Sequence, residues 1–572
     1  MNKETSHLNK KTVLRHSICA ALAAAIALGV GPTAFAAESN RSDVPDAGRV
    51  LRDAERTEPV IPEKSKIKVE VVEPVKPPMP AVEGLKIYVR EFRVTGQTVV
   101  NNRSLEDLLA PYTGKEQTYA DLNAAADIIA KHLRSQGWFL ADAYLPVQDI
   151  TEGVIEISVV IGRSGDVIVK NQSRLPEWII RQQMRAVSGG SYIHTDTVER
   201  AALLVGDLAG VDTKLTLAPG KTNGAVDIIL EVKDRDKQQT GSLTLSNHGS
   251  HYTGHEQASL VMSWDNLLRR GDSLSADVTT AGNGQLTGGF TWRVPVAEGR
   301  IVGFGYTRAR YEIGEDLAYL NMNGWADTLH ADWRQALIRT RDTNLHLTAG
   351  YDYRRLQDYS DGNSDTLKTL KTSYSGYITI SGDRVDNYGG GGASSYGVTW
   401  RRGHLTGTSD TGALPTGSWD KYSYYFLRQQ TVNQRLSLFL NFSGQLAGTN
   451  LDSSEKFTLG GANGVRAYPS GEASGDEAWL LTGELRWAIP LKNKTVFQLV
   501  GFYDTGVSFK EKFQTLEGAN RRALSGYGLG LRWTRPGHWA LKVDYARKAG
   551  SEAARSDIDR SGRLWVQSSF YF

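Results

Sequence analysis

RLSLFLNFSGQ, residues 435–445, carries the pattern that decides the fold of the C-terminal half of this chain. One face of this segment is apolar and carries Leu436, Leu438, Leu440 and Phe442. Serine, asparagine and glutamine occupy the other face, where Phe439 is an exception. A two-residue period of this kind predicts a β-strand that separates an apolar surface from a polar one.

The same alternation continues through residues 236–572, in sixteen segments of which the last ends at Phe572. In Trp539–Arg547, for example, Lys542 and Asp544 alternate with bulky apolar residues. Short turns alternate with long Gly-, Asp- and Ser-rich loops, among them residues 404–420, 447–477 and 548–562. An even number of strands with apolar residues outside and polar residues inside predicts an all-β, sixteen-stranded antiparallel transmembrane β-barrel in outer-membrane lipid.

Residues 1–36 have the three parts of a secretory signal peptide, so we expect an exported protein. Lys3, Lys10, Lys11 and Arg15 form a basic head, an apolar run follows to Val30, and Ala34-Phe35-Ala36 ends the segment. The apolar run is shorter than the roughly 20 residues that a membrane-spanning helix needs.

Residues 1–36 account for the net charge of the chain and contain its single cysteine. The four basic residues and one acidic residue of this segment give +3, which equals the net charge of all 572 residues. The mature chain is therefore close to neutral, and no nucleic-acid partner is predicted. Cys19 is the single cysteine, so the mature chain has no disulfide and no cysteine ligand or nucleophile.

Two segments precede the first predicted domain. Residues 37–57 include the polar stretch DAGRVLRDAE (46–55), which predicts a helix. Residues 58–83 contain Pro59, Pro62 and four further prolines. Proline fixes φ and withholds a hydrogen-bond donor, so this stretch is typical of an extended linker, or of a disordered tail.

Residues 84–161 and 162–235 repeat one order of elements, strand–helix–helix–strand–strand. In the first unit a long helix is expected over Tyr119–Ser135, with a capping box at Thr118 and Asp121 and an end at Gly137. In the second unit a helix over Thr197–Leu208 precedes the last two strands. A single α/β enzyme domain is the alternative, but no cofactor fingerprint supports it.

The longest predicted loop contains GGANGVRAYPSGEASGD (460–476), and a later strand contains FYDTG (502–506). Strand parity turns Phe502 and Asp504 toward the lumen. If the loop folds into the barrel, Arg466 meets Asp504 in a charge-assisted pair. Otherwise Arg466 is a solvated loop residue and Asp504 an ordinary polar residue of the lumen.

These motifs, in this order along the chain, resemble the outer-membrane transporters of two-partner secretion, the haemolysin and filamentous-haemagglutinin secretion family. The resemblance implies two POTRA domains (84–161 and 162–235) and an N-terminal plug helix. It also implies that a loop-tip motif contacts a motif on the barrel wall. The tip consists of Val465, Arg466, Ala467 and Tyr468, and the wall motif of Phe502, Asp504 and Gly506. Ala467 departs from the usual glycine, and its methyl group disfavours a positive φ at the tip.

The resemblance also implies a mechanism. The POTRA domains capture an unfolded exoprotein by its N-terminal secretion domain in the periplasm, and the sheet edges supply backbone hydrogen bonds. The helix near residues 46–55 leaves the pore, and the exoprotein crosses to the cell surface without ATP. No enzyme activity, cofactor or metal is expected.

Other interpretations are less well supported by the residues. A barrel-assembly factor of the same superfamily and a passive outer-membrane channel are the alternatives, whereas an enzyme lacks a G-x-S-x-G or H-E-x-x-H motif. Pro219-Gly220-Lys221-Thr222 lacks the first glycine of a phosphate-binding loop, since residue 215 is leucine. His251 and His255 have a spacing that metal sites use, but we expect a solvated loop there.

Overall fold

The computed structural model describes residues 45–572, apart from 56–59, 65–67, 72–85, 362–366, 411–412, 188–189 and the single positions 139, 151, 223, 283 and 516. The predicted signal peptide and most of the proline-rich segment lie outside the described residues. None of the helices in the described ranges is long and apolar enough to cross a membrane.

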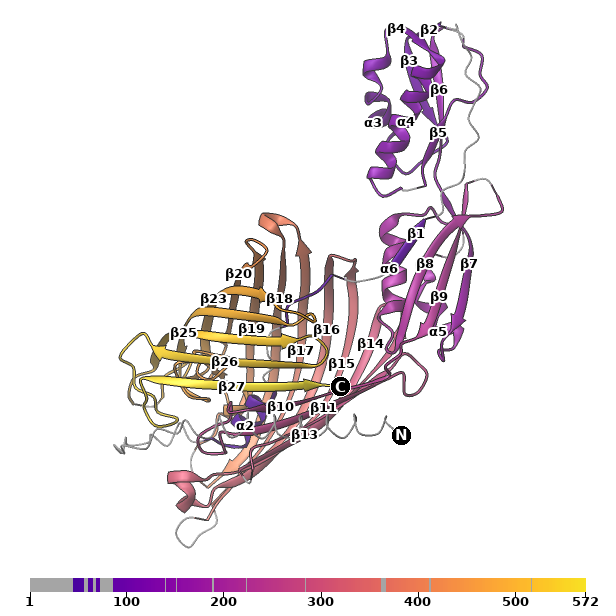
Figure 1. Cartoon of the computed structure of the whole chain (residues 1–572). Helices are drawn as coiled ribbons and strands as arrows, with labels where there is room; N and C mark the ends of the chain where they lie inside the picture. The colour runs from indigo at the N-terminus through magenta and orange to yellow at the C-terminus, as the bar shows by residue number, and fades with distance from the viewer. Residues whose placement is uncertain are drawn as a thin grey trace, which may run out of the picture. The chain divides into compact units, whose positions relative to one another are not determined.

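Sixteen antiparallel strands close into one barrel, as predicted (Figure 1). They are β10 (Gln239–Ser246), β11 (Gln257–Asp265), β12 (Ser273–Thr280), β13 (Gln285–Ala297), β14 (Arg300–Glu312), β15 (Asn323–Arg339), β16 (Thr343–Ser360), β17 (Leu367–Asp386), β18 (Gly392–Ser409), β19 (Gly417–Thr431), β20 (Leu436–Ala447), β23 (Glu477–Pro490), β24 (Val496–Phe509), β25 (Arg521–Arg535), β26 (Trp539–Lys548) and β27 (Gly562–Tyr571). The prediction of a long loop over 404–420 is wrong. Strand β18 continues to Ser409 and β19 begins at Gly417, so the connection between them is short.

The alternation of the sequence appears as two faces of the barrel wall. On β24, Leu499 and Tyr503 are about half exposed, whereas Phe502 and Asp504 are buried. Phe439 is the exception that the sequence indicated, an aromatic residue on the polar, lumen-facing side of β20. Its ring is only 8% exposed and lies 4.0 Å from the guanidinium carbon of Arg486, a cation–π contact inside the barrel.

The first α/β unit contains β2 (Lys86–Val89), β3 (Glu91–Thr95), α3 (Asn102–Asp107), β4 (Lys115–Thr118), α4 (Tyr119–Ser135), β5 (Asp142–Tyr144) and β6 (Val154–Val160). The predicted capping box of α4 is confirmed, with Thr118 and Asp121 each bonded to the other's backbone. Two separate strands open this unit, since β2 pairs with β4 and β3 pairs with β6.

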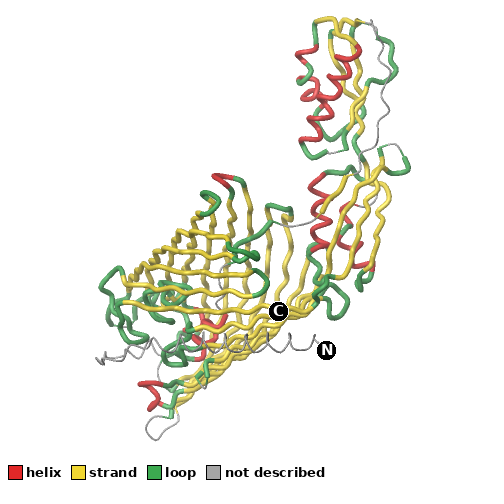
Figure 2. Tube along the Cα trace, viewed as in Figure 1, coloured by secondary structure: helices red, strands yellow, loops and turns green. Residues whose placement is uncertain are grey.

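The second unit contains β7 (Arg163–Gln172), α5 (Glu177–Gln183), α6 (Thr195–Gly206), β8 (Val211–Pro219) and β9 (Ala225–Asp234). Its sheet repeats that of the first unit, since β7 runs parallel to β9 and β8 runs antiparallel to it. Figure 2 shows each unit as helices beside a small sheet. Leucine, isoleucine and valine side chains of α5, α6 and the strands form the core of the second unit.

Part of the proline-rich segment forms a β-strand. Residues Lys68–Val71 form β1, which pairs in parallel with β8 and adds a fourth strand to the sheet of the second unit. Nζ of Lys214 lies 2.9 Å from a carboxylate oxygen of Glu70. The hydrogen bond to this carboxylate raises the pKa of Lys214.

The N-terminal helix α2 (Ala47–Glu55) packs against the barrel wall on β14, β15 and β16. Ala47, Val50 and Leu51 are buried there in one apolar cluster with side chains of the wall and its loops. The predicted polar helix is therefore amphipathic, with three apolar residues and Arg49 buried on it.

Candidate functional site

The loop between β20 and β23 folds into the barrel and brings the predicted tip against the wall. Val465, Arg466, Ala467 and Tyr468 are all buried. The tip closes on itself through the backbone, because Val465 donates to the carbonyl of Leu459 at 2.8 Å. Phe502, Asp504 and Gly506 lie on β24, whose lumen face the tip contacts.

Arg466 and Asp504 form a bidentate pair. Nε of Arg466 lies 2.8 Å from Oδ2 of Asp504, and a terminal guanidinium nitrogen lies 2.9 Å from Oδ1. The backbone N–H of Arg466 also donates to Oδ2 at 3.2 Å. Two parallel bonds of this kind fix both the position and the orientation of the guanidinium.

Two further carboxylates complete the surroundings of Arg466, and the sequence did not indicate this role for either. The remaining guanidinium nitrogen lies 2.8 Å from Glu484 on β23 and 3.3 Å from Asp544 on β26. Arg486 pairs with Glu484, and Arg532 pairs with Asp544. Three arginines thus face three carboxylates, so the cluster is balanced in charge, which a water-poor interior requires.

Aromatic side chains enclose the tip. The guanidinium carbon of Arg466 lies 3.4 Å from the centre of the Phe502 ring, and the indole N–H of Trp565 donates to the Arg466 carbonyl at 2.7 Å. The hydroxyl of Tyr468 donates to the carbonyl of Glu552 at 3.0 Å. Phe502 therefore acts as a flat support for the arginine.

Two glycines of the wall make room for the loop. Gly526 on β25 faces Ala467, and a Cβ atom at position 526 would lie 2.5 Å from that of Ala467. A Cβ at Gly506 would lie 2.8 Å from the side chain of Leu459. Ala467 is not among the described residues with positive φ, so the alanine keeps an ordinary backbone and its methyl group fills the space over Gly526.

A second attachment holds the loop to the external loop 549–561. Glu472 is buried and accepts hydrogen bonds from the backbone N–H groups of Arg555 and Ser556, at 2.9 Å and 2.8 Å. It also pairs with Arg522 of β25. The loop is thus attached at its tip and again six residues later.

Helix α2 contacts both the loop and the wall. Arg49 donates to the carbonyl of Gly471, and Arg52 donates to the carbonyls of Ser453 and Lys456 at 3.1 Å and 3.2 Å. On the wall side, the backbone N–H of Ala47 donates to Asp358 at 2.7 Å. A methyl group at Gly48 would collide with Ser453, so the helix lies close against the loop.

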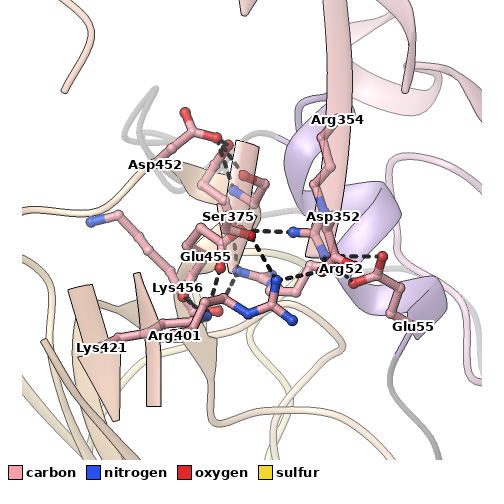
Figure 3. Close-up of polar contacts among 12 residues, drawn as sticks. Arg52, Glu55, Asp352, Arg354, Ser375, Arg401, Lys421, Asp452, Glu455 and Lys456 are labelled. Atoms are coloured by element: carbon pink, nitrogen blue, oxygen red, sulfur yellow. Dashed lines mark hydrogen bonds and ion pairs between the residues drawn. The ribbon is translucent and has the colours of Figure 1, made fainter. Parts of the chain in front are cut away.

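Two basic residues of the wall each bind one acid of α2 and one of the loop. Arg354 lies 2.9 Å from Glu55 of the helix and 2.8 Å from Glu455 of the loop (Figure 3). Lys371 lies 3.2 Å from Asp46 of the helix and 3.0 Å from Asp452 of the loop. The helix and the loop are therefore joined through shared cations of the wall.

Neighbouring residues extend this network along the lumen. Lys421 pairs with Glu455 at 2.8 Å, and Arg401 binds Asp352 and Ser375. Figure 3 shows these side chains converging from the wall on the loop and on α2. The wall residues among them occupy lumen-facing positions of their strands, which strand parity predicts. Parity does not predict which of these side chains contact one another.

The histidines of the first external loop differ from the prediction. The side chain of His251 is only 13% exposed and lies 3.4 Å from Asp557 of loop 549–561. The prediction of a solvated loop is wrong for this residue, because a second loop covers it.

The chain is similar in sequence to a family of secretion proteins and to individual outer-membrane transporters. The family described as "Haemolysin secretion/activation protein ShlB/FhaC/HecB" matches residues 224–533, and the ShlB-type POTRA domain matches residues 87–162. The heme/hemopexin transporter protein HuxB of Haemophilus influenzae is 26% identical over 491 residues, which are 83% of this chain and 86% of that protein. The outer membrane transporter CdiB of Escherichia coli is 23% identical over 427 residues, 71% of this chain and 70% of that protein.

Solved structures agree in fold. CdiB from Escherichia coli has a TM-score of 0.71 at 20% identity and covers 87% of this chain and 93% of its own. CdiB from Acinetobacter baumannii has a TM-score of 0.63 at 15% identity, with 88% and 94% covered.

The barrel, the loop folded into it and the α/β domain before it define an outer-membrane transporter with a periplasmic POTRA domain. The chain belongs to the haemolysin secretion/activation family of ShlB, FhaC and HecB, whose members function in two-partner secretion.

Replacement of Arg466 by alanine is expected to destabilise the folded barrel by about 3–5 kcal/mol, because it leaves buried carboxylates without a partner. Asp504→Ala should have a similar effect, and the double variant should lose much less than the sum of the two. Urea unfolding in lipid vesicles measures this, with Arg555→Ala as a control at a half-exposed pair. Additive effects would contradict a direct pair.

Gly526→Ala is expected to destabilise the barrel by about 1–3 kcal/mol, since its methyl group would overlap that of Ala467. The double variant Gly526→Ala, Ala467→Gly should recover most of that loss. The matched control is Gly501→Ala, where an added Cβ meets open space. Equal unfolding curves for Gly526→Ala and Gly501→Ala would show that the two residues are not in contact.

Proposed function

We propose that this chain is a gated secretion pore, which captures an unfolded exoprotein in the periplasm and passes it to the cell surface without ATP. Helix α2 is its plug, and the loop over 448–476 is the fixed element on which the plug rests. The observation that carries this proposal is the sharing of Arg354 and Lys371 between α2 and the loop.

The sharing makes departure of the plug feasible. When α2 leaves, Arg354 keeps Glu455 and Lys371 keeps Asp452, so neither buried cation of the wall is left without an acid. An unpaired buried charge would be strongly unfavourable, whereas loss of one of two partners is less so. The acids of the plug, Asp46 and Glu55, move to water or to the periplasm.

The loop has no comparable way to leave. Arg466 is surrounded by carboxylates from three different strands, and Glu472 holds a second point of the loop. Withdrawal of the loop would break the ion pairs of Arg466 and the hydrogen bonds of Glu472 at the same time. A fixed loop and a movable helix give a pore that opens on one side of the lumen.

Capture is assigned to the open sheet edge of the first POTRA unit. β5 is the terminal strand of its sheet among the described residues, and it corresponds to β8 of the second unit. β8 is covered by β1 of the same chain. An extended client segment would pair with β5 as β1 pairs with β8, through backbone hydrogen bonds that tolerate many sequences.

The names of the relatives support a transport function. HuxB is named as a heme/hemopexin transporter, and CdiB is named as an outer membrane transporter. We propose a secreted exoprotein with an N-terminal secretion domain, of the adhesin or haemolysin type, as the partner of this chain.

A disulfide between α2 and the loop tests the gate. Oγ of Ser453 lies 2.5 Å from a carboxylate oxygen of Asp46, and Cys19 in the predicted signal peptide is the single native cysteine. Oxidised Asp46→Cys, Ser453→Cys is expected to insert but to secrete little exoprotein, and reduction should restore secretion. Ser453→Cys alone is the control. Unchanged secretion by the oxidised form would show that α2 does not gate the pore.

Secretion itself is measured by co-expression with a candidate exoprotein in a host that lacks both. Loss of secretion is expected for Arg466→Ala and for a chain without residues 84–235, with barrels still inserted. A native chain that conducts ions in a planar bilayer but secretes no candidate would favour a passive channel. Reduced insertion of other barrels in a deletion strain would favour an assembly factor.

The capture edge is tested with a photo-crosslinking residue at Tyr144 on β5 or at Lys214 on β8. The first should trap the client, and the second should trap it only when Val69→Pro and Val71→Pro remove two hydrogen-bond donors of β1. Trapping at Lys214 in the native chain would show that β1 does not cover this edge during capture.

A further inference from the structure

Three potential metal-binding side chains from two loops converge beside the strand pair that closes the barrel. His251 and His255 lie in loop 247–256 after β10, and Asp557 lies in loop 549–561 before β27. One ligand atom of each lies within 4.8 Å of the other two. β10 follows directly on the second α/β unit, so its far end, and both loops, lie on the external side.

The separation of two of these atoms suits coordination of one ion. Nδ1 of His251 lies 3.4 Å from Oδ1 of Asp557. Tetrahedral zinc with bonds of about 2.0–2.1 Å holds its ligand atoms about 3.3 Å apart. The two loops therefore already present an imidazole and a carboxylate at the spacing that a shared ion would impose.

The second nitrogen of His251 has the partner that metal-bound histidines usually have. Nε2 lies 3.2 Å from Oδ1 of Asp316, on the short helix η4 (Glu315–Leu320). A carboxylate in this position fixes the ring and its tautomer and leaves Nδ1 free to bind a cation. A third loop thus contributes Asp316, which orients one of the three ligands.

The backbone of the histidine loop and the side chain of Asp557 are held in place without any ion. The backbone N–H of Gly249 donates to the carbonyl of His255 at 2.9 Å, and Ser250 and Gly254 form a β-bridge, so the loop is a closed turn. The other oxygen of Asp557 pairs with Arg563 at 2.5 Å, and its side chain is almost fully buried. Binding of an ion would therefore require little further ordering of the loop backbone or of Asp557.

We propose that His251, His255 and Asp557 bind one divalent transition-metal ion, of which zinc is the best match. Two imidazoles and one carboxylate suit zinc, copper or nickel rather than calcium or magnesium, which prefer oxygen ligands. Water or a client group would complete the coordination.

The bound ion connects the two strands at the closure of the barrel, where the ladder is short. β10 and β27 pair only from Ser242 with Tyr571 to Ser246 with Gln567, a shorter ladder than on their other sides. The ion joins the loops that extend from these two strands. Binding therefore stabilises the closed barrel, and it does so independently of the gate formed by α2.

Calorimetric titration of the full mature chain, refolded in detergent without a histidine tag, tests the site with zinc chloride. One ion per chain is expected, and His255→Ala and Asp557→Asn should each weaken binding at least tenfold. His538→Ala in an exposed periplasmic turn is the control and should bind as the native chain does. Magnesium chloride should give no heat of binding.

A second measurement separates a bridging ion from surface binding. The temperature at which the folded band is lost on a semi-native gel should rise with zinc and fall with EDTA in the native chain. It should not respond in His255→Ala. No stoichiometric binding, or equal affinity in native chain and both variants, would show that His251 and Asp557 form only a hydrogen-bonded ion pair.

Discussion

The enclosure of Arg466 by acids from three barrel strands is the interaction on which the rest of this lumen depends. A guanidinium and carboxylates removed from water lose hydration, and only close, well-directed pairing offsets that loss. Here Asp504 supplies two parallel bonds, and Arg486 and Arg532 balance the remaining charge. The loop that carries Arg466 is thereby kept within the barrel as a fixed part of its interior.

The fixed loop provides the surface against which the N-terminal helix packs. Gly48 permits close approach, and Arg49 and Arg52 bind loop carbonyls. The contacts of the helix differ in kind from those of the loop tip, because its acids share cations that also have a loop partner. The same lumen therefore contains one strongly held element and one element whose removal leaves the wall paired.

The two α/β units differ at one edge although their sheets have the same order. In the second unit β1 covers β8, whereas in the first unit β5 is terminal among the described residues. β1 belongs to the segment between α2 and the first unit. The strand that covers this sheet edge and helix α2 are thus close together in the sequence.

The sequence by itself determined the barrel, its strand number, the helix of the first unit with its capping box, and the faces of the strands. These features follow from local periods of two and about 3.6 residues, which a linear pattern carries directly. Parity placed Phe502 and Asp504 inside, and it also placed Asp544 inside. The pairing of Arg466 with Asp504 was available only as one of two interpretations until the family resemblance favoured it.

Only the tertiary structure decided which inward residues meet. Glu484 and Asp544 reach Arg466 because the register of β23 to β26 brings their lumen-facing positions near Asp504, with Glu484 opposite Phe502 and Asp544 opposite Gly530. No local pattern encodes that register. The contact of Ala467 with Gly526, the contact of Phe439 with Arg486 and the burial of His251 under another loop depend on barrel closure in the same way. So does the pairing of β1, whose partner lies far along the chain. Barrel closure and strand register join residues distant in sequence, so their consequences become visible only in the folded chain.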